Sequence, residues 1–145
     1  MQLDWNTFPA DDFEAAKKLA LEFYHSIGGV SCPALNGEEV SFNRKGIDHI
    51  LYKAARSHQQ IIERLSYLRY VVEMLTDPDA KTDFRFVKEK TYLKKHGQHQ
   101  LCDVEAKYWS FRKIVHATLV VKVLVRQVEN GKKHFYSIMK YEGPE

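Results

Sequence analysis

The spacing of apolar residues changes at Pro78, and this change restricts the possible folds more than any other feature of the sequence. Before Pro78 apolar residues recur at the spacing of amphipathic helices. After Pro78 they alternate with polar residues, as in strands that have one covered face. Helices followed by strands predict an α+β fold, with N-terminal helices packed on one face of an antiparallel sheet of about four strands.

Three helices are expected in the first half of the chain. The first covers residues 13–27, because acidic residues precede it and a pair of glycines ends it. Asn43 is a suitable N-cap for a second helix over residues 44 to about 56. A capping-box sequence then favours a third helix over residues 59 to about 76, although one bent helix across both stretches fits the pattern as well.

The helix expected over residues 44–56 has two contrasting faces. Its apolar residues fall on one face: Ile47, Ile50, Leu51 and Ala54. Its polar and cationic residues fall on the other: Lys45, His49, Tyr52, Lys53 and Arg56. Lys45, His49 and Lys53 follow one another at intervals of four residues, where like charges weaken a helix by roughly 0.2 to 0.5 kcal/mol per pair once the histidine is protonated. Such a stripe suits an anionic ligand.

Alternation in the second half predicts a series of strands: residues 84–88 with 91–94, then 102–111, 114–128 and 133–141. A polar loop is expected over residues 95–100, and a short strand at residues 40–42 also fits. The signal is strongest over residues 114–128. Its apolar residues should pack on the helices: Val115, Ala117, Leu119, Val121, Val123 and Val125. Its polar residues should share the uncovered face of the sheet: His116, Thr118, Lys122 and Arg126.

The last two strands are joined by Glu129-Asn130-Gly131-Lys132, which is a strong hairpin-turn sequence. A two-residue turn would place Leu124 opposite Ser137 on the uncovered face. A three-residue bulged loop would bring Tyr136 and Ile138 there instead, and the sequence is compatible with both registers.

Charge is distributed unevenly along the chain. Residues 1–78 carry a net charge of −3 and residues 79–145 carry +6. A basic, strand-rich half with interleaved aromatic residues suits a partner with a phosphate backbone. A lysine-rich solvated face explains the charge equally well.

Other classes of site are disfavoured. No stretch approaches the ~20 apolar residues of a membrane span, so a soluble cytoplasmic chain with no membrane partner is expected. Cys32 and Cys102 are expected to be free thiols. The spacing of His96, His99 and Cys102 resembles a zinc site, but a fourth ligand is lacking. No metal and no cofactor are therefore expected.

Several segments resemble a known superfamily. They are Val40-Ser41-Phe42-Asn43, Gly46-Ile47-Asp48-His49-Ile50-Leu51, the helix that ends at Asp77-Pro78-Asp79, the Val-rich strand, and His134-Phe135-Tyr136-Ser137-Ile138-Met139. Together they resemble the phage-type BECR nucleases, a superfamily named after barnase, EndoU, tRNA-cleaving colicins and RelE. The resemblance covers residues 40–141 as a nuclease core. It leaves residues 1–39 as an N-terminal helix and loop of the same single domain, residues 1–145.

The resemblance implies two helices on a four-stranded antiparallel sheet, with a metal-independent ribonuclease site on the open face. The implied catalytic residues are a helix histidine, a nearby polar residue, a strand lysine and a hydroxyl in the last strand: His49, Arg56, Lys122, and Ser137 or its neighbour Tyr136. Family members often have a second histidine or an Arg-His pair, so His58 is an alternative to Arg56.

Metal-free cleavage of RNA requires a base for the 2′-OH, cations for the phosphate and an acid for the leaving 5′-oxygen. His49 or His116 is the candidate for proton transfer, and Tyr136 or Ser137 for orienting or donating to the phosphate. Arg56, Lys122 and Arg126 are the candidates for holding that phosphate. Further substrate contacts are expected from polar residues nearby: Lys45, Lys53, His116, Thr118 and Arg126.

Two function classes follow. The first is a small endoribonuclease of toxin type, encoded on a phage or mobile element, that cleaves tRNA or a similarly structured RNA. Its expected partner is an antitoxin or immunity protein. It would act in the cytoplasm or be delivered as a toxin domain. The second is a non-catalytic α+β module whose basic sheet face binds nucleic acid or a protein.

Overall fold

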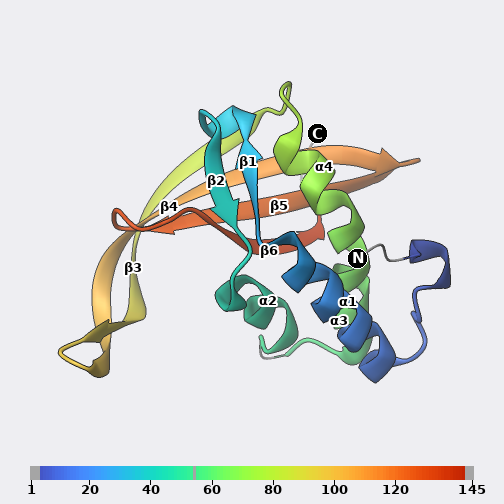
Figure 1. Cartoon of the computed structure of the whole chain (residues 1–145), viewed down its shortest axis with the longest axis horizontal. Helices are drawn as coiled ribbons and strands as arrows, with labels where there is room; N and C mark the ends of the chain where they lie inside the picture. The colour runs from blue at the N-terminus through green and yellow to red at the C-terminus, as the bar shows by residue number, and fades with distance from the viewer. Residues whose placement is uncertain (1–3, 54, 143–145) are drawn as a thin grey trace.

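The computed structural model describes residues 4–53 and 55–142. It has the expected α+β class, with helices packed against a mostly antiparallel sheet (Figure 1). The strands are β1 (Gly29–Cys32), β2 (Glu38–Ser41), β3 (Thr82–Lys95), β4 (Gln98–His116), β5 (Leu119–Val128) and β6 (His134–Lys140). The sheet has six strands in the order β1-β2-β6-β5-β4-β3, so the prediction of about four strands is too low.

The helices are α1 (Phe13–Ile27), α2 (Arg44–Leu51), α3 (His58–Ser66) and α4 (Val71–Thr76), with short 3-10 turns η1 (Trp5–Thr7), η2 (Pro33–Leu35) and η3 (Tyr67–Tyr70). α1 has the predicted bounds and begins where the Asp12 side chain accepts a hydrogen bond from the backbone N–H of Ala15. The helix predicted at residues 59–76 is present as α3 and α4, with η3 between them. None of the helices in the described ranges has both the length and the apolarity that crossing a membrane would require.

α2 is shorter than predicted. It starts at the expected N-cap, Asn43, whose side chain accepts from the Gly46 N–H, but it ends at Leu51 instead of near Arg56. Arg56 lies in the loop that follows and donates from Nη1 to the carbonyl oxygens of His49 and Ile50, at 2.8 and 3.1 Å. Because that guanidinium satisfies carbonyls at the end of the helix, the chain turns away there.

The loop after α2 separates it from α3, so the chain forms two helices and not a single bent one. Ser57 and Gln60 make the predicted capping box at the start of α3. On α2, Ile47, Ile50 and Leu51 are buried as expected. Ala54, the fourth residue predicted for that apolar face, lies outside the described residues.

A glycine allows α2 to pack closely on β6. A Cβ atom at Gly46 would lie 2.3 Å from the carbonyl oxygen of Phe135. The Phe135 ring stacks on Phe42, with centroids 5.3 Å apart, and both rings meet the buried side chain of Tyr24 on α1. The last strand is therefore held against α1 and α2 in the centre of the hydrophobic core.

β1 and β2 form a short antiparallel hairpin that the pattern predicted only in part, at residues 40–42. Each strand has four residues, and a 3-10 turn separates them, so little alternation is available to predict them. β2 runs parallel to β6, with Ser41 opposite His134. The N-terminal segment and the last strand thus belong to one sheet.

The prediction of one strand over residues 114–128 is wrong. β4 ends at His116 and β5 begins at Leu119, so Ala117 and Thr118 form the turn between two antiparallel strands. Ala117 adopts a left-handed backbone with φ 46°, and no Gly or Asn marks this turn in the sequence. His116 and Thr118 are exposed at the end of the hairpin, so they do not share a face with Lys122 and Arg126 as predicted.

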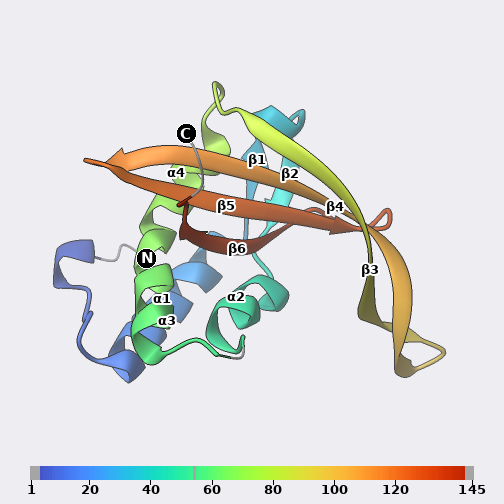
Figure 2. The same ribbon diagram turned by 180° about the vertical axis from the view of Figure 1, so that it is seen from behind.

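β3 pairs with β4 along the full length of β3, and the polar loop predicted at residues 95–100 is only a tight turn at His96 and Gly97. β5 pairs with β4 only from Ala106 onward, so the rest of the hairpin extends past the other strands. Figures 1 and 2 show this end of the hairpin bending toward the side of the sheet on which α2 lies.

Both predicted registers of the last hairpin apply in part. Leu124 pairs with Ser137, whereas Val125 pairs with Phe135, so Tyr136 is the additional residue of a β-bulge. The bulge lets Phe135 and Ile138 enter the core, so the prediction of Ile138 on the uncovered face is wrong, while Tyr136 is only partly covered. The predicted apolar face of β5 is confirmed, since Val121, Val123 and Val125 are fully buried.

Candidate functional site

A depression of about 320 Å³ lies where α2 and α3 meet the open face of strands β3 to β6. Its lining comes from six elements and the loop after α2: His49, Lys53, Arg56, Arg64, Arg85, Tyr108, Leu124, Tyr136 and Met139. Four of these nine side chains are lysine or arginine and carry a positive charge at neutral pH: Lys53, Arg56, Arg64 and Arg85. The depression therefore concentrates positive charge around one histidine.

His49 and Tyr136 are in contact in this depression. Their ring centroids are 4.4 Å apart with 33° between the planes. Burial, followed by the positive charges of nearby residues, lowers the pKa of His49 to about 4 from its ordinary 6.5. Those charges belong to Arg56, Lys53, Arg64 and Arg126. At neutral pH the imidazole is consequently uncharged and can accept a proton.

Arg56 and Arg64 bring two guanidinium groups close together. Arg64 donates from Nη1 to Ser137 Oγ at 3.4 Å and to the Ile138 carbonyl oxygen at 3.5 Å. Burial and the neighbouring Arg64 lower the pKa of Arg56, and burial lowers the pKa of Arg64. Neither arginine takes part in an ion pair within residues 4–53 and 55–142. Their charge is thus available to an anionic ligand.

Arg126 differs, because a carboxylate neutralises it. Its Nε donates to Glu89 Oε1 at 3.0 Å, and the Tyr108 hydroxyl donates to the same carboxylate at 2.8 Å. Burial opposes ionisation of Glu89, but these hydrogen bonds outweigh it and keep the pKa of Glu89 below its ordinary value. The Arg126 guanidinium carbon lies 5.1 Å from the Tyr136 ring centroid. This buried network supports Tyr136 from behind.

The structure brings several of the predicted site residues together. His49, Lys53, Arg56 and Tyr136 line the same depression. Arg126 and Ser137 lie directly behind it, through their contacts with Tyr136 and Arg64 respectively. These residues come from both ends of the predicted nuclease core.

Other predicted residues lie elsewhere. Lys122 lines a neighbouring depression of about 340 Å³. Lys45 is exposed on the first turn of α2, and its charge acts on His134. His116 and Thr118 are at the β4–β5 turn and outside the depression. The alternative to Arg56, His58, stacks on Phe13 with ring centroids 3.8 Å apart, so Arg56 is the one of the two that reaches the depression.

The sequence argument missed Arg64, Arg85 and Glu89. A signal existed for Arg64, which interrupts the apolar seam of the third helix eight residues after Arg56. Arg85 alternates with Phe84 and Phe86, but only the pairing of Arg85 with Tyr108 reveals that it faces the depression.

Within the described ranges, no group of three or more His, Cys, Asp or Glu residues could hold a metal ion, and both cysteines are free. Comparisons with protein-family models, with curated proteins and with solved structures found no match for this chain.

Proposed function

We propose that this protein is a metal-independent endoribonuclease of toxin type, which cleaves RNA by attack of a ribose 2′-OH on the adjacent phosphate. The observation that supports it best is an uncharged histidine, His49, in contact with Tyr136 and surrounded by arginine and lysine side chains. The resemblance to BECR nucleases implies the same chemistry.

His49 is the proposed general base. A base must be deprotonated before it takes the 2′-OH proton, and the lowered pKa of His49 meets that condition at neutral pH. A bound phosphate would offset part of the surrounding positive charge, so the pKa of His49 would rise toward its ordinary value in the complex. The base would then become stronger at the moment when substrate is present.

Arg56 and Arg64 are the proposed phosphate ligands. Each uses Nη1 to bond a backbone carbonyl, which leaves the other N–H groups of the guanidinium for phosphate oxygens. Fixed cations around the phosphate stabilise the negative charge that grows on it in the transition state. Lys53 and Arg85 add positive charge on either side.

Tyr136 is the proposed positioning hydroxyl, or donor, near the phosphate. Arg126 and Tyr108 pack on its ring, at 5.1 Å from the guanidinium carbon and 5.6 Å between ring centroids. Ser137 acts indirectly, as an acceptor for Arg64. Together they hold the tyrosine and the arginine in place before substrate binds.

The test is cleavage of purified tRNA and total RNA in EDTA, with product ends analysed for 2′,3′-cyclic phosphate. His49→Ala should lower the rate about 100-fold or more, which is typical of losing a general base. His116→Ala is the matched control, since it removes an exposed histidine outside the depression. Cleavage at the wild-type rate by His49→Ala, or cleavage abolished by EDTA, would refute the proposal.

Binding of RNA without any cleavage would instead favour the non-catalytic nucleic-acid module. The toxin assignment has its own test: expression of the wild type should arrest growth of a host cell, and His49→Ala should not. An antitoxin or immunity protein that blocks this depression would need acidic side chains to match its charge.

A further inference from the structure

We infer, on the basis of the proposed function, that the depression around His49 is the middle of a longer cationic trough. The trough binds an extended single strand of RNA through phosphates on both sides of the one that is cut. Three features support this: the depressions join, their positive charge continues from one to the next, and their floor is partly apolar.

The central depression joins one neighbour on each side. It shares Arg85, Tyr108 and Leu124 with the depression that contains Lys122. It shares Lys53, Arg56, Arg64 and Met139 with a third depression, of about 420 Å³, that reaches Lys140. Each is near the lower end of the roughly 300 to 1,000 Å³ of small-molecule sites, so only the three together accommodate a longer chain.

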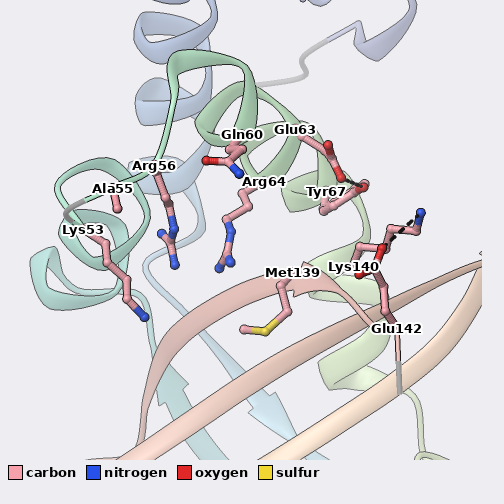
Figure 3. Close-up of a pocket in the computed structure, with 10 residues that line it drawn as sticks. All are labelled: Lys53, Ala55, Arg56, Gln60, Glu63, Arg64, Tyr67, Met139, Lys140 and Glu142. Carbon is pink, nitrogen blue, oxygen red and sulfur yellow. Dashed lines mark hydrogen bonds and ion pairs between the residues drawn. The ribbon is translucent and has the colours of Figure 1, made fainter. Parts of the chain in front are cut away.

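Positive charge continues along this path. Lys122 and Arg85 stand at one end, and Lys140 stands at the other. Between them, Figure 3 shows Lys53, Arg56 and Arg64 extending side by side toward Met139 on β6.

The carboxylates along the trough already have partners. Asp83 pairs with Arg112 and Glu89 with Arg126. Glu63 accepts a hydrogen bond from the Tyr67 hydroxyl, and Glu142 pairs with Lys140 at 3.6 Å. Lys53, Arg56, Arg64, Arg85 and Lys122 form no ion pair in the described part of the chain. Of these four carboxylates only Glu63 has no ion pair within the described ranges, so the five unpaired cations give the trough an excess of positive charge.

The floor of the trough favours a single strand over a duplex. Leu124, Tyr136 and Met139 are only partly buried there and offer apolar and aromatic surface between the cations. Single-strand binding sites combine such surface, which contacts bases, with a cationic groove that follows the backbone. A duplex keeps its bases stacked inside and would leave this surface without a partner.

The test uses oligodeoxythymidylates, because DNA lacks the 2′-OH and is bound without being cut. Fluorescence anisotropy would compare a dinucleotide, an octanucleotide and an octamer duplex over a range of salt concentrations. We expect the single-stranded octanucleotide to bind at least tenfold more tightly than the other two. The plot of log affinity against log salt should steepen by about 0.7 for each additional phosphate in contact.

Alanine variants identify which parts of the trough contribute to binding. Lys122→Ala and Lys140→Ala should each lower affinity for the octanucleotide at least threefold and leave dinucleotide binding unchanged. Arg64→Ala should weaken both ligands. Lys18→Ala is the control for loss of one positive charge, since Lys18 is exposed on α1 and outside all three depressions.

Equal affinity for the two lengths, tighter binding of the duplex, or end variants that behave like Lys18→Ala would overturn the trough. The outcomes also separate it from the proposed function. RNA cleavage without length-dependent binding would refute the trough alone. Length-dependent binding by a protein that cuts no RNA would refute the ribonuclease and leave the trough as a binding surface.

Discussion

Replacing Gly46 by alanine tests whether close packing of α2 on β6 positions the candidate site. A Cβ atom there would lie 2.3 Å from the Phe135 carbonyl oxygen, 2.7 Å from Phe135 Cδ1 and 2.8 Å from the Tyr24 hydroxyl oxygen. Non-bonded atoms pack best at about 3.5 Å or more, so helix and strand must separate by roughly 1 Å. A backbone oxygen cannot rotate away, so the movement involves the whole of α2.

Two effects of opposite sign decide the change in stability. Alanine is better than glycine inside a helix by about 0.8 to 1 kcal/mol. Overpacking a tightly filled core costs about 1 to 3 kcal/mol. Because the added methyl group meets both the sheet and α1, we take the upper end, which predicts a net loss of about 2 kcal/mol in the free energy of unfolding.

Urea denaturation of the wild type, Gly46→Ala and Gly29→Ala measures this. Gly29 is the matched control, because a Cβ there would meet only the end of the Glu39 side chain. Its stability should stay within about 0.5 kcal/mol of the wild type. Since α2 carries His49, any RNA cleavage should fall further in Gly46→Ala than its unfolded fraction explains. A Gly46→Ala variant as stable as the wild type would refute this account of the packing.

Three further predictions concern single side chains. His134 is 5% exposed, and burial lowers its pKa to about 4 from 6.5. The contribution of neutral His134 to stability is therefore complete above about pH 6.5 and is lost as the pH falls toward 4. The expected loss in the free energy of unfolding is about 2 kcal/mol between pH 7 and pH 5. In urea titrations at both pH values, His134→Gln should lack that loss. Glu89→Ala leaves a buried Arg126 unpaired and should lower the free energy of unfolding by about 3 kcal/mol, whereas Asp83→Ala, at an exposed ion pair, should cost less than about 1 kcal/mol. Ser57→Ala removes the capping box and should cost about 1 kcal/mol in the same assay, and an unchanged midpoint would show that the cap is dispensable.

The sequence predicts the α+β class because the spacing of apolar residues in each helix or strand can be recognised within a short stretch of the chain. Where conformation depended on one unusual backbone angle, prediction failed. Ala117 takes a left-handed conformation that glycine or asparagine usually adopts, so alternation appeared to continue through the turn. The hairpin of β1 and β2 is too short to show a period, and it is stabilised by pairing with β6, far along the chain.

The candidate site was likewise predicted only in part. His49, Lys53 and Arg56 are close in sequence, so their proximity was predicted, but the helix that was expected to carry all three ends at Leu51. Arg56 reaches the site from the following loop, through hydrogen bonds to the carbonyl oxygens of His49 and Ile50. Arg85 joins them only because β3 pairs with β4 in a particular register. The register between these strands depends on tertiary packing, so no local pattern of residues reveals it.

The parallel pairing of β2 with β6 has a consequence for biosynthesis. β2 and α2 leave the ribosome well before β6, which carries both the edge that β2 extends and the surface that α2 covers. Contacts between such distant segments form late, because a long loop must close first. His49 therefore meets Tyr136 only after β6 has been synthesised and has left the ribosome. For the proposed ribonuclease, the nascent chain would remain inactive toward the RNA around it until β6 has left the ribosome.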